Sequence, residues 1–548
     1  MDQDLISRQE VRAKLELAYT AWTRYRSVSQ SEADAIVEAI AAAARANAQR
    51  LADRAVEETG YGNARDKFAK NMLAADVLPN RMRGMRTLGL LREIPGEKIV
   101  EIGVPMGVVA AILPTTNPTS TAIYKTLIAL KAGNGIVIAP HPRAKACTCE
   151  TVSILAEAAV KAGAPEGLIQ CITTPTVEGT NELIRHRRTA VILSTGGAGM
   201  VRAAYSSGKP AYGVGPGNVP VLVDVSANVP GAIARIVEGK SFDYGTLCSS
   251  EQTLVAEKSL REQILAALKA NRAHRCDIPQ TAALERLLIT KDFAINPDCV
   301  GQSPEKIAKM AGFEVPKDTS ILFVEIDGIG KQHPLSAEKL SPVLSLHFVA
   351  DFNAALDACE AVLRFGGLGH TCGIYATDDA RIRSFAFRMP AYRVVANAPT
   401  PTGSTGIATN LFPAMTLGCG AVAGNSTSDN ISPLHLINIK RLAYAVDAAK
   451  MPAELDPSAI DRAQIVSAVE RYLANRGVPR SEAPPSPPAP VPTPAPRLEE
   501  SPVDFVCEDD VRKAIAQSKK IFIGPKTIVT PSARDLAGPT EVLIVIKK

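Results

Sequence analysis

The sequence lacks any run of about 18 or more apolar residues, the length that a helix needs to cross a bilayer. It also lacks a dense block of Lys and Arg and any alternation of basic and aromatic residues, and its formal net charge is only +5. Those features would indicate a membrane span or a nucleic-acid surface. We therefore expect neither a membrane nor a nucleic acid as a partner.

The 10 cysteines are scattered, and the polar N-terminus MDQDLISRQE lacks the apolar core of a secretory signal. We therefore expect a reducing, cytoplasmic setting. Cys147 and Cys149 form a C-x-C pair, but no second pair of ligands at zinc spacing accompanies them. The sequence consequently predicts no metal site.

The chain does have length and an ordinary globular composition. Its 548 residues are 46% hydrophobic and 21% charged, which is enough for two or three folded domains. Short apolar runs that alternate with helical segments predict a parallel sheet covered by helices on both faces. These runs lie at 108–113, 135–139, 167–172 and 190–194. A second block of the same type, with runs at 253–256, 321–326 and 345–350, extends from about residue 239 to 421.

Two helices are predicted at the N-terminus. Val11, Leu15 and Trp22 recur on one helical face, and Ser31 with Asp34 has the pattern of a helix start before a long Ala-rich stretch. We expect the first helix to present an apolar stripe and the second to begin at Ser31.

The C-terminal part of the sequence changes character. Nine prolines within 479–496 predict an extended, disordered linker. Beyond the linker, Val511, Ile515, Ser518 and Phe522 recur at helical spacing, with acidic residues before them and lysines near the end. This order suits a helix dipole and predicts an amphipathic helix.

Four segments carry the candidate chemistry. LPTTNP at 113–118 follows a strand and can present the Asn117 amide at the carboxyl edge of the sheet. LSTGGAGMV at 193–201 is a strand followed by a glycine turn and a helix, where a backbone can approach a phosphate, although many such turns bind nothing. The other two are AYGVGPGNVP at 211–220 and FDYGTLCSSEQ at 242–252, which contains Cys248.

In this order the four segments resemble the aldehyde dehydrogenase superfamily, over roughly residues 5–475. A closer resemblance is to the CoA-acylating acetaldehyde and propionaldehyde dehydrogenases of bacterial microcompartments. It is carried by EETGYGNARDKFAKN, LPTTNPTST, FDYGTLCSSEQ, FGGLGHTCGIY and NISPLHLINIKRLAY. The resemblance implies an aldehyde dehydrogenase-like α/β fold with a Rossmann-type cofactor domain and an α/β catalytic domain.

Combined with the composition, the resemblance divides the chain into five parts. We expect N-terminal helices and an NAD- and CoA-binding domain in 1–238, and a catalytic domain in 239–421. Residues 422–478 would return to the cofactor domain and form an oligomerisation segment. The linker occupies 479–496 and the tail 497–548.

The resemblance also implies roles for individual residues. Cys248 would attack the aldehyde, and its backbone N–H with the Asn117 amide would hold the oxyanion. His370 would either assist thiol deprotonation or merely satisfy local backbone groups. Hydrolytic members carry a glutamate where Gly213 stands, and its loss favours release of the acyl group to CoA rather than to water. Glu251 is the weaker candidate for a substitute base.

Further positions fall where the family binds the dinucleotide. They are Thr115, Pro140, Arg143, Thr195, Gly196, Gly197, Gly213, Gly215 and Glu338. Arg143 would contact the phosphates of NAD or CoA, or be a solvated surface residue. Glu338 would contact the nicotinamide ribose or be an exposed loop residue, and the family's following Phe is Leu340 here.

The sequence thus predicts an NAD-dependent, CoA-acylating aldehyde dehydrogenase for propionaldehyde or acetaldehyde. The alternatives are a hydrolytic aldehyde dehydrogenase and a scaffold whose tail is the working part. The tail resembles the encapsulation peptides of bacterial microcompartments, which implies shell proteins as partners and a place in the lumen, within the bacterial cytoplasm. The N-terminal helix is the competing targeting element. The resemblance also implies a homodimer or homotetramer.

Overall fold

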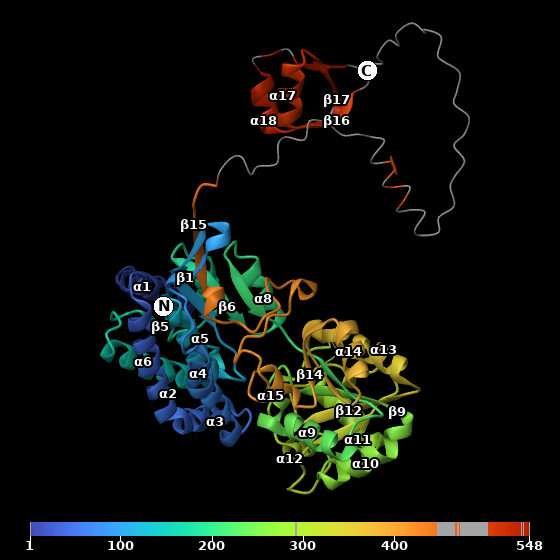
Figure 1. Cartoon of the computed structure of the whole chain (residues 1–548). Helices are drawn as coiled ribbons and strands as arrows, with labels where there is room; N and C mark the ends of the chain where they lie inside the picture. The colour runs from blue at the N-terminus through green and yellow to red at the C-terminus, as the bar shows by residue number, and fades with distance from the viewer. Residues whose placement is uncertain are drawn as a thin grey trace, which may run out of the picture. The chain divides into compact units, whose positions relative to one another are not determined.

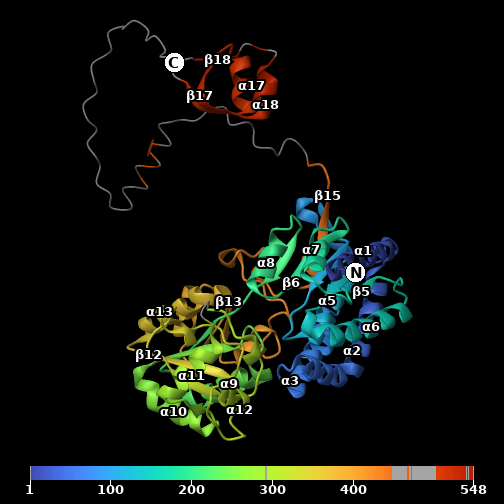
Figure 2. The same cartoon turned by 180° about the vertical axis from the view of Figure 1, so that it is seen from behind.

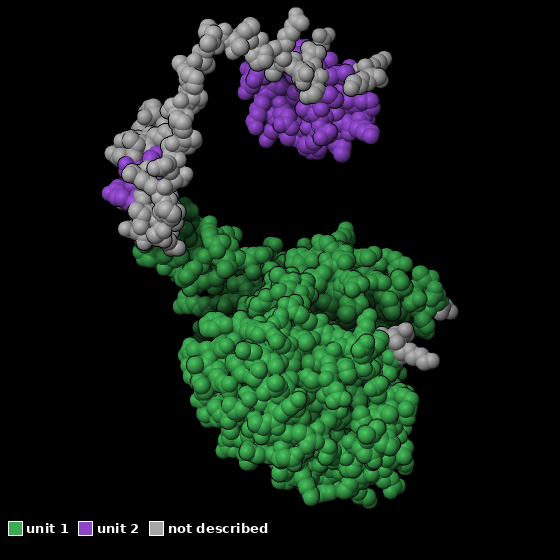
Figure 3. Space-filling view, turned by 90° about the vertical axis from the view of Figure 1, so that its right-hand side faces the viewer, with its two compact units in different colours: residues 1–447 green, residues 448–548 purple. Residues whose placement is uncertain are grey.

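A computed structural model describes residues 2–290, 293–446, 466–467, 469, 471, 502–538, 540 and 542–546. The chain forms two compact units, Met1–Asp447 and Ala448–Lys548 (Figure 3). The linker predicted at 479–496 lies outside the described residues. Within the described parts, no helix combines the length and the hydropathy that a membrane crossing requires.

A five-stranded parallel sheet in the order β5-β4-β3-β6-β7 forms the first half of the larger unit. Its strands are β3 (Val108–Ile112), β4 (Gly135–Ala139), β5 (Ile169–Cys171), β6 (Thr189–Thr195) and β7 (Ala211–Val214). Both faces of β3 and β4 are buried along their whole length, as continuous apolar runs require. The four strands predicted from those runs are confirmed.

Helices cover both faces of this sheet (Figure 1). Val109 and Ala111 of β3 pack with one group of helices, whereas Val108 and Ala110 face the other group, because side chains alternate along a strand. The first group is α2 (Gln30–Thr59), α5 (Pro118–Lys131) and α6 (Lys145–Lys161). The second is α1 (Gln3–Tyr25), α7 (Val177–Arg185) and α8 (Ala198–Tyr205).

Helix α2 begins two residues before the Ser-Asp pair that was predicted to start it. Ser29 is the N-cap, and its hydroxyl accepts a hydrogen bond from the Glu32 backbone while the Glu32 carboxylate accepts one from the Ser29 backbone. This reciprocal capping box satisfies two free N–H groups, which the Ser31 pattern does not. After α2 come α3 (Ala64–Met72), the π-helical turn η1 (Leu73–Val77) and α4 (Leu78–Met82).

A seven-stranded sheet in the order β10-β11-β12-β9-β8-β13-β14, also parallel, forms the second half of the unit (Figure 2). Its strands are β8 (Val219–Val223), β9 (Glu251–Glu257), β10 (His274–Arg275), β11 (Leu322–Glu325), β12 (Val343–Val349), β13 (Gly369–Tyr375) and β14 (Ala391–Ala396). Its helices are α9 (Val229–Ser241), α10 (Arg261–Ala270), α11 (Ile278–Leu288), α12 (Pro304–Met310), α13 (Phe352–Val362), α14 (Asp379–Arg388) and α15 (Thr400–Ser404).

The passage between the two sheets lies earlier than the boundary expected at residue 238. β7 is the edge strand of the first sheet, and β8 already lies between β9 and β13 in the second. The crossing is therefore the four-residue loop 215–218, and α9 belongs to the second half of the unit. Similar apolar runs lie before and after this loop, and such runs do not show to which of two parallel sheets a strand belongs.

A three-stranded antiparallel sheet brings the end of the larger unit back to its beginning. β1 (Gly89–Ile94) and β15 (Ile437–Ala443) flank β2 (Ile99–Pro105) on either side. The expected return of the chain after residue 422 is thus present in β15.

The tail folds as a small α/β unit rather than as one amphipathic helix. β16 (Val503–Val506), α17 (Glu508–Ala516), β17 (Ile521–Val529), α18 (Pro531–Ala537) and β18 (Leu543–Val545) form a parallel sheet in the order β16-β17-β18. Val511 is buried in its core, Ser518 turns the chain with φ 53°, and Phe522 lies on a strand. The predicted helix was wrong beyond residue 516, because the helical spacing to Phe522 arises by chance across a turn.

Candidate active site

Cys248 lies in the loop between the 3-10 helix η4 (Phe242–Gly245) and β9, and it is partly buried. Gly245 has φ 72°, and an added Cβ there would lie 2.7 Å from the backbone oxygen of Ser341. The turn therefore requires glycine. In this way the spacing Phe-x-x-Gly-x-x-Cys places the thiol at the amino end of a buried strand.

His370, at the start of β13, contacts the thiol directly. Its Nε2 lies 3.1 Å from Cys248 Sγ, and its Nδ1 lies 3.0 Å from the Thr371 hydroxyl. Burial, followed by the nearby Arg393 guanidinium, lowers the pKa of His370 to about 3. The imidazole is therefore neutral, and its Nε2 lies within hydrogen-bond distance of the thiol. The two ring nitrogens of His370 contact a hydroxyl and a thiol. They do not make the contacts with local backbone groups that the sequence analysis gave as the alternative role of His370.

The thiol of Cys248 is also neutral at physiological pH. Burial raises its pKa to about 12, and the charges of Glu338 and Cys419 add to the effect while Arg393 opposes it. Arg393 is buried on β14 and donates to the backbone carbonyls of Gly418, Ser428 and Gly369. Its positive charge acts on both Cys248 and His370, and the sequence analysis did not identify it.

Asn117 is buried at the N-cap of α5, directly after the loop that follows β3. Its Oδ1 accepts a hydrogen bond of 2.6 Å from Lys70 Nζ, and its Nδ2 donates to the Thr116 hydroxyl at 3.0 Å. The same lysine donates to the Thr246 hydroxyl at 3.2 Å, two residues before Cys248. Lys70 thus joins the asparagine loop to the cysteine loop.

The loop between the two sheets packs against the nucleophile. A Cβ on Gly217 would lie 2.1 Å from the backbone oxygen of Cys248 and 3.3 Å from the His370 ring, so the approach requires glycine. The Gly217 N–H donates to the Glu338 carboxyl at 3.2 Å. Glu338 is buried, not an exposed loop residue, and burial raises its pKa to about 8.

Several of the predicted dinucleotide residues lie at one edge of the five-stranded sheet, whereas Glu338 precedes β12 of the other sheet. Thr115, Pro140 and Thr195 follow or end β3, β4 and β6, whose carboxyl ends share that edge because the strands are parallel. Arg143 is exposed there and donates to the Tyr61 hydroxyl at 3.4 Å. Gly197 is the N-cap of α8, with open space where a side chain would stand. These residues fit a dinucleotide whose phosphates face the start of α8.

A cavity of about 380 Å³ lies where this edge meets the seven-stranded half. It is lined by α8, Gly215, Pro216 and the segment around Cys419, and Arg202 and Arg364 contribute guanidinium groups. Two positive charges in the wall suit an anionic cofactor or co-substrate.

Comparisons with known proteins agree with this arrangement. A model of the aldehyde dehydrogenase family matches residues 2–280. An acetylating aldehyde dehydrogenase from Geobacillus thermoglucosidasius is 48% identical, with a TM-score of 0.81 over 82% of this chain and 99% of that one. The chain belongs to the aldehyde dehydrogenase family. The predicted superfamily and fold class are thereby confirmed.

Two further relatives bear on function. The bifunctional aldehyde-alcohol dehydrogenase AdhE of Escherichia coli is 39% identical over 85% of this chain, which spans only 55% of that protein. A propionaldehyde dehydrogenase from the Clostridium phytofermentans fucose utilisation bacterial microcompartment is 28% identical, with a TM-score of 0.73 over 79% of this chain and 97% of that one.

In this member of the family, Gly213 has no room for a side chain. A Cβ on Gly213, in β7, would lie 2.7 Å from a methyl group of Val201 and 3.0 Å from the Tyr205 ring, both on α8. Gly215 lines the cavity and has open space at its Cβ position. If a carboxylate is missing from this loop, the space for it lies at Gly215.

Glu251 does not reach the cysteine side of β9. Its Oε1 accepts a hydrogen bond of 2.7 Å from the Thr400 backbone, and the side chain lies against Gly239 of α9. Burial raises its pKa to about 7. Glu251 thus contacts α9 and Thr400, and its recorded hydrogen bond goes to the Thr400 backbone rather than to Cys248.

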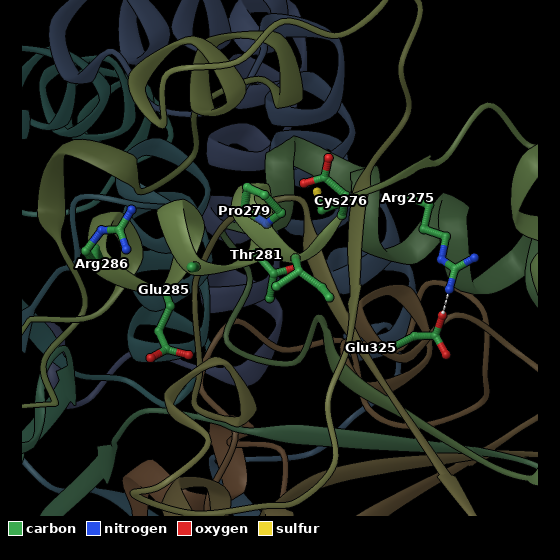
Figure 4. Close-up of a pocket in the computed structure, with 10 residues that line it drawn as sticks. Arg275, Cys276, Pro279, Thr281, Glu285, Arg286 and Glu325 are labelled. Atoms are coloured by element: carbon green, nitrogen blue, oxygen red, sulfur yellow. Dashed lines mark hydrogen bonds and ion pairs between the residues drawn. The ribbon is translucent and has the colours of Figure 1, made fainter.

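A wider cavity, of about 860 Å³, lies along β10 and α11 (Figure 4). Arg275 and Glu325 form an ion pair of 2.6 Å in its wall. β10 is the edge strand, three places from β9 in the sheet, and none of the predicted site residues lines this cavity. Of the predicted site residues, Gly215 lines the smaller cavity.

Proposed function

We propose that this chain is an NAD-dependent, CoA-acylating aldehyde dehydrogenase for short-chain aldehydes such as propionaldehyde or acetaldehyde. The observation that carries the proposal is the 3.1 Å contact between the Cys248 thiol and a neutral His370. A nucleophile paired with a base is the arrangement that covalent acyl transfer needs. The 48% identity to an acetylating member of the family supports it.

The first half of the reaction forms a bond to Cys248. His370 Nε2 accepts the thiol proton while the sulfur attacks the aldehyde carbon, and the alkoxide is held by the Asn117 amide and the Cys248 backbone N–H. NAD, when bound at the carboxyl edge of the five-stranded sheet near Thr195, Gly197 and Glu338, supplies the hydride acceptor that converts the thiohemiacetal into a thioester.

The second half passes the acyl group to CoA. Once His370 has released the first proton to solvent, it accepts the proton of the CoA thiol, whose sulfur bonds to the acyl carbon. The bond to Cys248 Sγ then breaks, and His370 returns the proton to that sulfur. The products are acyl-CoA and the free thiol of Cys248. Gly213 stands where hydrolytic members of the family carry a glutamate, which favours a thiol over an activated water as the acceptor.

Hydrolysis is the second candidate, and Glu338 is the observation in its favour. Its carboxyl is close enough to raise the pKa of Cys248, and its own pKa of about 8 suits a general base. Against this, its Oε1 is engaged by the Gly217 N–H.

Product analysis separates the two reactions. Purified protein is incubated with propionaldehyde and NAD, with and without CoA, and the product is identified by mass. We expect propionyl-CoA with CoA present and about one equivalent of NADH per site without it. Sustained propionate formation without CoA that is lost in Glu338→Gln would establish the hydrolytic reaction instead.

We further propose that residues 497–548 bind microcompartment shell proteins and place the enzyme in the lumen of a microcompartment in the bacterial cytoplasm, as a homodimer or homotetramer. The relative from a fucose utilisation microcompartment supports this setting. The competing N-terminal helix is a poor candidate, because Val11 and Leu15 are fully buried against the five-stranded sheet. Light scattering of the purified protein tests the oligomeric state.

The surface that would bind the shell is the helix-free face of the tail sheet. Val506 and Val529 pack in the core with the helices, so their neighbours Phe505 and Ile528, which pair across β16 and β17, face the other way. They are 55% and 66% exposed. Two large apolar side chains side by side on an open sheet face suit a protein partner.

A further inference from the structure

Lys70 is a fully buried lysine on α3 that the reaction steps above do not use. It is 1% exposed, and within the described part of the chain its ammonium donates hydrogen bonds to side-chain oxygens of Asp243, Asn117 and Thr246. α3 belongs to neither sheet, Asn117 follows a strand of the first, and the other two partners precede a strand of the second. One ammonium therefore holds together three segments distant in sequence.

The carboxylate in this cluster is fixed independently of Lys70. Asp243 also forms an ion pair of 3.0 Å with Lys67, and it accepts hydrogen bonds from the Asn63 backbone and from the Thr246 hydroxyl. It has φ 48°, a left-handed conformation that Asp tolerates better than most residues. Loss of Lys70 would thus leave Asp243 with a counter-ion, so a Lys70 variant has a reason to remain folded.

The contact with Asn117 decides which way its amide is turned. An ammonium can only donate, so the atom 2.6 Å from Lys70 Nζ must be the amide oxygen, and the nitrogen must be turned away from Lys70. Positive charge on the oxygen side also polarises the amide and strengthens its N–H as a donor. Burial lowers the pKa of Lys70 to about 8, against the pull of Asp243, so the side chain is still largely protonated at neutral pH.

We propose that Lys70 is a positioning residue for acyl transfer, whose ammonium fixes the Asn117 amide so that its nitrogen is presented to the oxyanion. The proposal rests on the proposed function, in which Asn117 holds that oxyanion. A lysine that serves stability alone would interact with Asp243 and Thr246 in the same way and would have no effect that depends on Asn117.

Lys67 is the matched control. It lies on the same helix, is 2% exposed and pairs with the same carboxylate, but its other bond goes to the backbone oxygen of Thr116 rather than to the Asn117 side chain. Replacement of either lysine by Met removes a buried charge from the same cluster. Only replacement of Lys70 removes the donor to the amide.

The test is a double-mutant cycle on turnover in the full-length enzyme. Lys70→Met, Lys67→Met and Asn117→Ala are made singly, and each lysine variant is combined with Asn117→Ala. Turnover and KM are measured with propionaldehyde, NAD and CoA, and NAD binding and Tm report on folding. We expect Lys70→Met to lower kcat by about tenfold or more with little change in KM for the aldehyde.

In the Asn117→Ala background, Lys70→Met should cost less than about threefold in kcat, because the amide through which it acts is gone. Lys67→Met should reduce kcat by the same factor in both backgrounds. Equal factors for Lys70→Met in both backgrounds would overturn the proposal. If Asn117→Ala alone leaves kcat intact, the assignment of the oxyanion donor fails instead. Should Lys70→Met not fold, Lys70→Gln, which keeps an N–H donor without charge, enters the same cycle.

Discussion

The neutral state of both Cys248 and His370 determines how the thiol should react. With a thiol pKa of about 12, the thiolate is a minor species, and its fraction rises by about tenfold for each pH unit. We expect the alkylation rate of Cys248 by iodoacetamide to rise by about tenfold for each pH unit, or about a hundredfold from about pH 7 to pH 9, without levelling. Peptide mass mapping follows Cys248 apart from the other cysteines. A plateau near neutral pH would mean that the thiol pKa is depressed, contrary to this expectation.

Replacement of the nucleophile should separate chemistry from cofactor binding. Cys248→Ala removes the sulfur but leaves the cofactor edge at Thr195 and Gly197 untouched. We expect aldehyde oxidation to fall to background while the affinity for NAD, measured by fluorescence titration, stays within about twofold of the original. Substantial remaining turnover would reveal another nucleophile.

Gly213 in β7 and Gly215 in the loop before β8 offer a paired test of why the acyl group leaves to CoA. Gly215→Glu places a carboxylate where the Cβ position is open to the cavity, so we expect part of the product to become free acid. Gly213→Glu instead meets Val201 and Tyr205 on α8, so we expect a lower Tm. Exclusive acyl-CoA formation by a folded Gly215→Glu variant would rule out a missing base as the explanation.

Among the site residues, those in local motifs could be read from the sequence and those held by distant contacts could not. Asn117 and Cys248 each follow a strand or a glycine turn that marks them. Lys70 is 173 positions from Asp243 in the sequence. In addition, a Lys in an amphipathic helix is ordinarily predicted to be exposed to solvent. The DKFAK spacing puts Lys67 and Lys70 one helical turn apart, which is the only local signal of the cluster.

At the scale of elements, the predictions succeeded where one physical cause dominates. β3 and β4 are buried on both faces, so an uninterrupted apolar run identifies them. The tail failed because its apolar residues alternate between helix and strand: α17 ends at Ala516, and Phe522 belongs to β17. Apolar residues at helical spacing therefore do not show whether a helix continues or whether a strand follows it after a short turn.

The fold of the tail predicts opposite effects for two substitutions. Val511 on α17 is fully buried in the tail core, so Val511→Asp should unfold residues 497–548, as circular dichroism would show. Phe505 is exposed on the helix-free face, so Phe505→Asp should leave the spectrum unchanged. Loss of structure in Phe505→Asp would mean that this face is internal to the tail and not a binding surface.

At the scale of the whole chain, catalysis and targeting should be separable. The larger unit contains Cys248, His370, Asn117 and the dinucleotide edge, and the tail has an apolar core of its own. The enzyme truncated after Arg476 should therefore retain full turnover. A large loss of kcat on truncation would show that the tail contributes to the active unit.

The same division predicts where each part goes in a cell that makes microcompartments. Residues 497–548 fused to a fluorescent protein should co-localise with shell proteins, whereas the enzyme truncated after Arg476 should be diffuse. The exposed pair Phe505 and Ile528 is a small surface, so binding by one tail should be weak and should depend on many copies at the shell. Phe505→Asp in the fusion should therefore abolish co-localisation while the tail stays folded. A diffuse fusion beside a truncated enzyme that is still encapsulated would assign targeting to the larger unit.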